Sequence, residues 1–304
     1  MAFCEQCGNK MNDGAKFCST CGAKVVIQQA GAPAPAPQVN EDPAAINNLG
    51  TAAYNKGNFS EATEHFRKAA NLGSVESQHN LGVCYEHGNG VTQDLSKAVE
   101  WYSKAAAQGY SMSQHNLGVF YENGNGVAKD INKAVEMYSK AAAQGYVMSI
   151  HNLGVCYESG KGVAQSYAKA IEQYTKAAAQ GYSLSQHNLG VCYENGLGVP
   201  QDYAKAVEWY QKAADQGFAL SQNNIGAYYQ NGIYFTKNFA KAVEWYQKAA
   251  NQGLDMAQLN LGTCYAKGEG VPTDYNKAEE LWKKAAAQGN ANAITNLELL
   301  KDLK

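Results

Sequence analysis

The chain has little arginine, little net charge and no long apolar run. Among its 25 basic residues Arg67 is the only arginine, and the formal net charge is −2 over 304 residues. Arginine supplies most bidentate phosphate and base-edge contacts, so this composition argues against a nucleic-acid partner. No apolar run approaches the roughly 18 residues of a membrane span, and the N-terminus does not resemble a signal peptide. We therefore expect no membrane segment, and a cytoplasmic location by default.

In place of these features the sequence has a repeat of 36 residues. A short phrase returns at that interval: Asn80-Leu81-Gly82, Asn116-Leu117-Gly118, Asn152-Leu153-Gly154, Asn188-Leu189-Gly190, Asn224-Ile225-Gly226 and Asn260-Leu261-Gly262. A fixed period between 20 and 50 residues indicates one supersecondary unit stacked on copies of itself. The apolar content of 45% is enough to bury a continuous core along such a stack.

Each repeat predicts two helices and a loop. The first helix covers roughly Val75 to His87 and ends at Gly88, which suits a left-handed cap. The second begins after Asp94 and ends before Gly109. Every repeat has a preferred N-cap residue at the position of Asp94: Asp130, Ser166, Asp202, Asn238 and Asp274. The expected fold is therefore all-α, with helix-turn-helix repeats.

The repeat pattern divides the chain into five parts. We expect a cysteine-rich unit at 1–24, an Ala/Pro-rich linker at 25–43, and a first repeat at 44–73 whose loop is four residues shorter than the others. Six full repeats then occupy 74–289, and 290–304 offers one capping helix. Glu298 replaces the mid-helix glycine there, as suits a terminal repeat with a polar outer surface.

The repeated residues resemble a known family. The phrase Leu-Gly-x-x-Tyr-x-x-Gly-x-Gly-Val, followed by Asp-x-x-Lys-Ala and Lys-Ala-Ala-x-Gln-Gly, is similar to the Sel-one-like repeat, a relative of the tetratricopeptide repeat. The first repeat looks more like a tetratricopeptide repeat proper, and Ile233-Tyr234-Phe235 departs from the Gly-Val of the other loops. The resemblance covers about 260 residues. It implies a right-handed α-solenoid that serves as a non-enzymatic protein-protein interaction scaffold.

The eight cysteines fall into two groups. Four occupy one position per repeat, where other repeats have Phe120 and Tyr228: Cys84, Cys156, Cys192 and Cys264. A position that exchanges cysteine with aromatic residues is an apolar packing position, so we predict buried, unreactive thiols. No repeat holds a second cysteine to pair with, which favours a reducing compartment.

The other four cysteines predict a zinc site. Cys4 and Cys7, then Cys18 and Cys21, form two Cys-x-x-Cys-Gly knuckles ten residues apart. Four thiolates suit one tetrahedral, structural Zn²⁺ per chain, and so short a unit needs the metal to fold. Disulfides or a redox Cys-x-x-Cys pair are the alternatives. The segment also resembles the short bacterial zinc-ribbon domain.

Two local motifs have catalytic interpretations. Ser166-Tyr167-Ala168-Lys169 matches the Ser-x-x-Lys of serine β-lactamases, a label that some cysteine-rich relatives of the repeat family carry. Ser166 nevertheless occupies the N-cap position, and neither Ser-Asp-Asn nor Lys-Thr-Gly occurs in the chain. The Gly-x-Gly pairs follow helices rather than strands, so they are loop caps and not a phosphate loop. We expect no enzyme activity.

A stripe on the first helices is the candidate partner site. Resemblance to tetratricopeptide helices places it on the concave surface, where a row of methionine and leucine beside polar groups is typical of a peptide groove. Its residues are Met112, His115, Asn116, Val119 and Glu122; Met148, His151, Asn152, Val155 and Glu158; and Leu184, His187, Asn188, Val191 and Glu194. His79, Asn80, Val83, Glu86, Leu220 and Met256 extend the stripe in the neighbouring repeats.

Other interpretations of this stripe remain open. The asparagines could bond a neighbouring loop, and the histidines could reflect recent repeat duplication; a metal shared along the histidine row is less favoured, since adjacent helices are roughly 10 Å apart. On this surface His115, His151 and His187 should gain charge below about pH 6.5 and then favour acidic over basic ligands. The row of Glu122, Glu158 and Glu194 would oppose that preference at neutral pH. The function expected is a scaffold that binds a protein or peptide, with a β-lactamase-like hydrolase and a nucleic-acid adaptor using the zinc ribbon as alternatives.

Overall fold

The computed structural model describes residues 2–3, 10–11 and 42–301. The chain separates into two compact units, Met1–Asp42 and Pro43–Lys304. In the first unit, strand β1 (Ala2–Phe3) pairs antiparallel with β2 (Lys10–Met11), with Ala2 opposite Met11. The four predicted zinc ligands, Cys4, Cys7, Cys18 and Cys21, lie outside the described residues.

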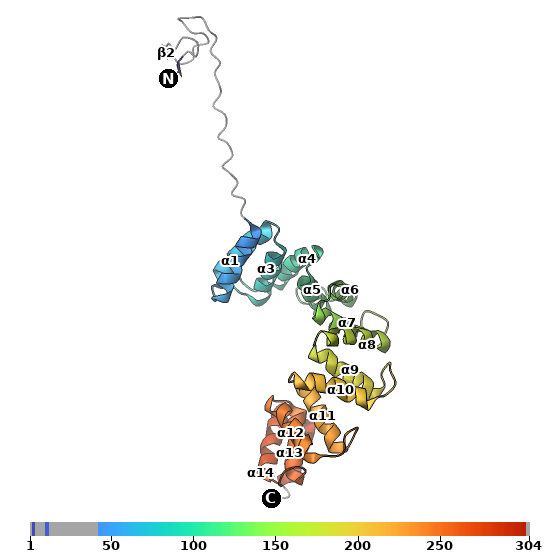
Figure 1. Cartoon of the computed structure of the whole chain (residues 1–304). Coiled ribbons are helices and arrows are strands. Elements are labelled where there is room, and N and C mark those ends of the chain that lie inside the picture. Colours follow the sequence, from blue (N-terminus) through green and yellow to red (C-terminus); the bar gives the residue numbers. More distant parts are fainter. Residues whose placement is uncertain (1, 4–9, 12–41, 302–304) are drawn as a thin grey trace. The chain divides into compact units, whose positions relative to one another are not determined.

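The second unit is a series of helical hairpins (Figure 1). The described residues form fifteen helices: α1 (Pro43–Asn55), α2 (Phe59–Asn71), α3 (Val75–His87), α4 (Leu95–Ala107), α5 (Ser111–Asn123), α6 (Ile131–Ala143), α7 (Val147–Ser159), α8 (Tyr167–Ala179), α9 (Ser183–Asn195), α10 (Tyr203–Asp215), α11 (Ala219–Asn231), α12 (Phe239–Asn251), α13 (Asp255–Lys267), α14 (Tyr275–Ala287) and α15 (Ala291–Lys301). Each odd-numbered helix packs on the even-numbered helix that follows it, and the next hairpin packs on that. The predicted α-solenoid is confirmed.

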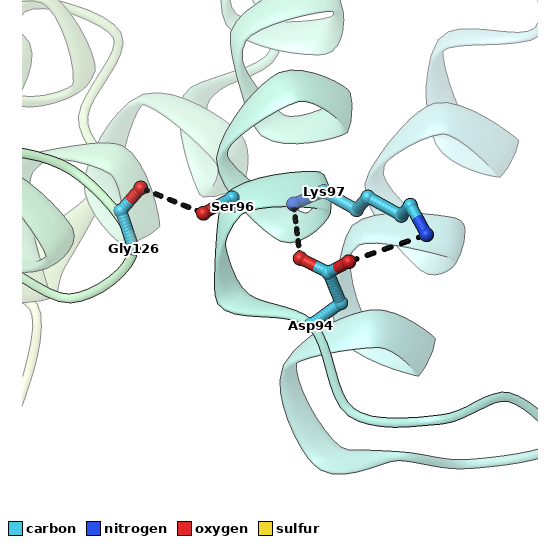
Figure 2. A network of polar contacts seen from close by, with 4 residues as sticks. All are labelled: Asp94, Ser96, Lys97 and Gly126. Carbon is cyan, nitrogen blue, oxygen red and sulfur yellow. Dashed lines mark hydrogen bonds and ion pairs between the residues drawn. The ribbon is translucent and has the colours of Figure 1, made fainter.

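The predicted helix ends are also confirmed. Asp94 caps α4 by accepting from the backbone N–H of Lys97 at 3.0 Å, and its other oxygen is 3.2 Å from Lys97 Nζ (Figure 2). Asp130, Ser166, Asp202, Asn238 and Asp274 cap α6, α8, α10, α12 and α14 in the same way, whereas the Asn58 side chain makes no cap bond to α2. Gly88 ends α3 with φ of 75°, in the left-handed region. Figure 2 also shows Ser96 Oγ donating to the Gly126 carbonyl of the next loop, at 3.3 Å.

Within a hairpin, a glycine on the first helix lies directly under an aromatic ring of the second. A Cβ added at Gly82 would be 2.6 Å from Cδ1 of Tyr102, so a larger residue would displace the ring. The same contact joins six more pairs: Gly50 with Phe66, Gly118 with Tyr138, Gly154 with Tyr174, Gly190 with Tyr210, Gly226 with Tyr246, and Gly262 with Trp282. The glycine of the repeated phrase is therefore required by close packing of the two helices.

A buried glutamine on the first helix forms a hydrogen-bond ladder with an exposed glutamine at the end of the second helix and with the preceding hairpin. Gln144 Nε2 donates to Gln114 Oε1 at 2.8 Å, and Gln114 Nε2 donates to the Ala106 carbonyl at 3.2 Å. The pattern recurs at most interfaces, but Ile150 replaces the glutamine on α7 and is buried, 3% exposed. These bonds satisfy carbonyls at the ends of the second helices, which a stack of helices would otherwise bury unpaired.

The repeat cysteines are buried and free, as predicted. Burial raises the pKa of Cys156 to about 11 and that of Cys192 to about 12, so both thiols stay protonated and unreactive. Leucines of the repeated phrase share these cores, with Leu81 and Leu261 fully buried. No helix in the described part of the chain is long and apolar enough to cross a membrane.

Candidate partner-binding surface

The predicted stripe belongs to the first helix of each hairpin. We call it the A-helix face: Met112, His115, Asn116, Val119 and Glu122 on α5, with the residues at the same positions on α3, α7 and α9. The positions do not form one uniformly exposed row. Each residue type has its own environment, and the same environment returns in hairpin after hairpin.

The histidines of this face lie between hairpins, where His79, His115 and His151 are buried and His187 is half-buried. His115 is 9% exposed, and its Nδ1 is hydrogen-bonded to Oγ of Ser149 on α7 at 2.9 Å. The neighbouring interfaces repeat this contact at 2.8 to 2.9 Å: His79 with Ser113, His151 with Ser185, and His187 with Ser221. The expectation that the histidines face solvent is therefore wrong, because each ring connects its helix to the next one.

The burial of these histidines also changes their titration. The His115 ring packs between Tyr138 and Tyr146, with ring centroids 5.8 and 5.1 Å away. Burial lowers the pKa of His115, and lowers the pKa of His79, His151 and His187 to about 4. In the folded protein the predicted gain of charge near pH 6.5 is therefore wrong, because His79, His151 and His187 gain charge only near pH 4. A neutral imidazole matches its serine partner and its apolar surroundings.

The glutamates of the A-helix face are fixed by tyrosines of the second helices. Tyr138 OH donates to Glu122 Oε2 at 2.7 Å. The flanking hairpins repeat the bond: Tyr102 with Glu86 at 2.5 Å, Tyr174 with Glu158, and Tyr210 with Glu194 at 2.5 Å. Burial, and then the bond to Glu122, raises the pKa of Tyr138, while a hydrogen bond from Asn152 acts in the opposite direction. One buried phenol thus holds both a glutamate and the asparagine of the next hairpin.

The apolar positions differ in exposure. Met148 is 37% exposed and Met256 is 43% exposed, whereas Met112, Leu184 and Leu220 are half-buried. Val119, Val155 and Val191 are half-buried and pack against the hydrophobic clusters of the adjacent hairpins. The exposed part of the apolar line is therefore the methionines and leucines near the start of each helix.

Sequence reasoning missed a small pocket at the N-terminal end of this face. It has a volume of about 140 Å³ and is lined by Thr51, Tyr54, Phe66, Asn80 and Val83. Phe66 stands where later hairpins have the hydroxyl-bearing tyrosine, and Tyr54 stands where they have the glutamate. These two substitutions could have indicated the pocket from the sequence. Together they remove the hydrogen-bonded tyrosine and glutamate that fill the equivalent space in the later hairpins.

The catalytic alternative gains no support from the site geometry. Ser166 Oγ accepts from the backbone N–H of Lys169 at 3.3 Å, as Asp130 accepts from Lys133 at 3.0 Å. The serine is thus an N-cap, and Lys169 Nζ lies 5.3 Å from the ring centroid of Tyr157. Within the described ranges no three histidine, cysteine or acidic side chains are grouped to hold a metal ion.

Two sets of known proteins are similar to this chain. DAP3-binding cell death enhancer 1 of Rattus norvegicus is 44% identical over 52 residues, which are 17% of this chain and 10% of that protein. The Mus musculus protein of the same name is 43% identical over 51 residues, again 17% and 10%. The chain therefore spans about a tenth of the length of these curated relatives.

The solved structures match over a much longer stretch. A Sel1 repeat protein from Oxalobacter formigenes is 37% identical, with 85% of this chain and 76% of that chain covered and a TM-score of 0.75. A protective antigen present in uropathogenic Escherichia coli strains, which displays an SLR fold, is 39% identical, with 77% of this chain and 50% of that chain covered and a TM-score of 0.73.

Two family models match the sequence itself. The zinc-ribbon domain model matches residues 3–25. The Sel1 repeat model matches seven consecutive segments: 43–74, 75–110, 111–146, 147–182, 183–218, 219–254 and 255–290. The first of these includes α1 and α2, so the shorter hairpin is counted with the others. With most of its length matched, the chain belongs to the Sel1 repeat family.

Proposed function

We propose that the protein is a non-enzymatic scaffold that holds a peptide or protein segment on the A-helix face. Sel1 repeat proteins are generally protein-interaction scaffolds. The observation that carries the proposal is the line of exposed and half-buried methionines and leucines, including Met148 and Leu184, beside glutamates that tyrosines already hold in place. Apolar side chains with fixed polar neighbours favour specific docking of another chain.

The test is a charge inserted into the apolar line. Met148→Glu with Leu184→Glu should abolish partner capture by affinity purification from source cells, since a bound apolar segment would bury unpaired carboxylates. A partner identified in this way is purified and its rebinding measured. The matched control is Ser139→Glu with Thr175→Glu, which adds the same charge at exposed positions of α6 and α8.

The control should bind like the unaltered protein, and both variants should melt within a few degrees of it. If the Met148 and Leu184 variant keeps its fold and its partner, the A-helix face is not the binding surface. If both variants lose the partner, the effect is one of net charge rather than of location.

We also propose that Cys4, Cys7, Cys18 and Cys21 hold one structural Zn²⁺. The zinc-ribbon match over 3–25 and the four thiols in two Cys-x-x-Cys-Gly knuckles support this. Pairing of β1 with β2 brings together the residues flanking the first knuckle, with Phe3 opposite Lys10. The metal would cross-link the two knuckles and contribute folding free energy, without an open position for catalysis.

Metal analysis should find one zinc per chain in the reduced protein and less than a tenth of that in Cys18→Ser with Cys21→Ser. Because the two units are separately compact, zinc removal should leave the helical unfolding transition unchanged. Native protein without metal and with these cysteines in disulfides would contradict the proposal.

A further inference from the structure

The first helices of the hairpins from α1 to α11 carry no basic side chain other than histidine. Helices α1, α3, α5, α7, α9 and α11 contain no lysine or arginine. The acidic residues on them are Glu76, Glu86, Glu122, Glu158 and Glu194. The lysines of these repeats lie on the loops, as at the exposed Lys161, and on the second helices; among the first helices of the full hairpins only α13 has one, Lys267. The A-helix face therefore presents carboxylates and apolar groups, and the helices that form it contribute no lysine or arginine.

The second helices have a different charge pattern. Their lysines pair with acids on the same helix, as Lys140 with Glu136 at 2.6 Å and Lys176 with Glu172 at 2.6 Å. Lys212 pairs with Glu208 at 2.8 Å. These exposed pairs balance the charge of that side locally. The unbalanced negative charge of the repeats is thus gathered on the same face as the exposed methionines.

The carboxylates of the A-helix face are held in position before any partner arrives. Each of Glu86, Glu122, Glu158 and Glu194 uses Oε2 to accept from a buried tyrosine, and each is only half-buried. The row stops at Gln230, which accepts from Tyr246 at 2.6 Å. A fixed carboxylate loses less conformational entropy when it binds a cation than a mobile surface glutamate does.

The row begins beside the pocket lined by Tyr54, Phe66 and Val83. Its 140 Å³ and largely apolar lining leave room for one apolar side chain. The Tyr54 hydroxyl accepts from Asn89 Nδ2 at 2.7 Å, which fixes one wall of the pocket. Because the apolar pocket is at one end and the carboxylates lie along the rest, a bound segment would have one preferred orientation on this surface.

We propose that the partner is a lysine- or arginine-rich segment with an apolar anchor residue, seated in the pocket at Phe66 and extending over Glu86, Glu122, Glu158 and Glu194. This inference rests on the function proposed above. The carboxylates of the A-helix face attract the positive charges of such a segment. They repel an acidic segment, whose negative charges would find no cation there. Neighbouring first helices are roughly 10 Å apart and an extended chain rises about 3.3 Å per residue. Basic residues at every third position would therefore match the row.

The probe is a labelled 15-residue peptide with leucine near one end, lysine at every third position, and serine and glycine between. Two counterparts replace every lysine by glutamine or by glutamate. Binding to the full chain is followed by fluorescence anisotropy at low and moderate salt. The lysine peptide should bind at least tenfold more tightly than the glutamine peptide, and this advantage should shrink with salt, while the glutamate peptide should not bind.

Two matched triple variants each remove three negative charges, one from the first helices and the other from the second helices. Glu122→Gln, Glu158→Gln and Glu194→Gln together should weaken the lysine peptide about tenfold and abolish the salt effect. Gln230 shows that glutamine at this position still accepts from the tyrosine, so the fold is retained. The control triple, Glu136→Gln, Glu172→Gln and Glu208→Gln, changes the net charge equally on the second helices and should leave binding within twofold.

The outcomes separate this inference from the proposed function. If the glutamine peptide binds as tightly as the lysine peptide and loses binding in Met148→Glu with Leu184→Glu, the cationic partner is wrong and the surface stands. If the two triple variants weaken binding equally, charge location does not matter and the inference fails. Dimers that disappear in the Met148 and Leu184 variant would identify a second copy as the occupant and overturn it. If no peptide binds at any salt, the cationic partner is wrong, and the capture experiment with Met148→Glu and Leu184→Glu decides the proposed function separately.

Discussion

The hairpins of residues 111–218 and the hairpin of residues 219–254 share one skeleton and differ on their surfaces. All contain the glycine-under-tyrosine contact and a capped second helix, which in the later hairpin are Gly226 with Tyr246, and Asn238. The buried glutamine, Gln222 in the later hairpin, is present in all but the hairpin with Ile150. Four of the positions that change alter the polar groups, the core or the loop backbone. Asn223 replaces the buried histidine, Tyr228 the cysteine or phenylalanine, Gln230 the glutamate, and Tyr234 the loop glycine.

The difference separates what the stack requires from what it tolerates. Gly226 lies against Tyr246 of the next helix and Gln222 donates to the Ala214 carbonyl of the preceding one, so a change at either position disturbs two helices at once. Asn223 and Gln230 keep hydrogen bonds with other partners: Asn260 donates to Asn223 at 3.0 Å, and Tyr246 donates to Gln230. The later hairpin therefore keeps the packing of the stack while losing its titratable groups on this face.

The largest expected effect is a loss of stability at low pH, which should come from the hairpins with histidine and not from the hairpin with Asn223. The pKa of His151 and His187 is lowered from 6.5 to about 4 in the folded protein. Between these values the unfolded chain binds protons that the folded one does not, so stability falls as the pH drops. The loss between pH 7 and pH 5 should be about 2 kcal/mol for each of the two histidines.

Urea unfolding at pH 7, 6 and 5 measures this loss. The variant His151→Asn with His187→Asn copies Asn223. It should reduce the loss of unfolding free energy between pH 7 and pH 5 by about 4 kcal/mol for the pair, although it is less stable than the unaltered protein at pH 7. An identical pH slope in the double variant would show that these histidines are not the groups responsible.

The next largest effect should be equal in the two hairpins. An added Cβ would lie 2.6 Å from Tyr174 in Gly154→Ala and 2.7 Å from Tyr246 in Gly226→Ala. Each change should cost about 2 kcal/mol of unfolding free energy, because the overlap exceeds the gain in helix propensity. In a Tyr174→Leu background Gly154→Ala should cost far less. Clearly unequal costs at the two glycines would contradict a shared skeleton.

Removing one hydroxyl should stabilise the later hairpin. Among the described residues, only Tyr228 OH is a buried side-chain polar atom without a hydrogen-bond partner. Tyr228→Phe should therefore gain about 1 kcal/mol in chemical unfolding. Phe120→Tyr, at the same position of α5, should lose a similar amount, and Tyr210→Phe should lose the bond to Glu194. Destabilisation by Tyr228→Phe would mean that this hydroxyl is satisfied in solution.

The smallest effect should come from the loop of the later hairpin. Tyr234 has φ of 62°, where the other repeats have a glycine at equivalent positions, and its ring is 58% exposed. Tyr234→Gly should raise stability by about 1 kcal/mol, since a bulky residue is strained in the left-handed region. Gly198→Ala should do the reverse, because its Cβ would lie 2.6 Å from Cβ of Tyr167. A lower melting temperature for Tyr234→Gly would show that the ring contributes more than the backbone strain costs.

Much of the fold was predictable because its signals are local or periodic. The N-caps at Asp94 and Ser166 and the left-handed Gly88 depend on residues within one turn of a helix end. The burial of Cys156 followed from its exchange with Phe120 at the same repeat position. The candidate surface was less predictable. Helical periodicity distinguishes the two sides of a helix, but it does not predict which neighbouring helices will cover each side.

The sequence alone determined the period, the helix ends and the positions that face the core, since each depends on the chain's own spacing. Only the tertiary structure decided which polar residues of the first helices stay exposed. His115 is buried because the next hairpin brings Ser149 and Tyr146 against it, and Glu122 is fixed because Tyr138 reaches it from the second helix. The pocket at Phe66 likewise depends on three helices meeting, and each of these contacts joins residues at least sixteen positions apart or on different helices. Stacking of one hairpin on the next creates these environments, and it is governed by packing across helices rather than by local spacing.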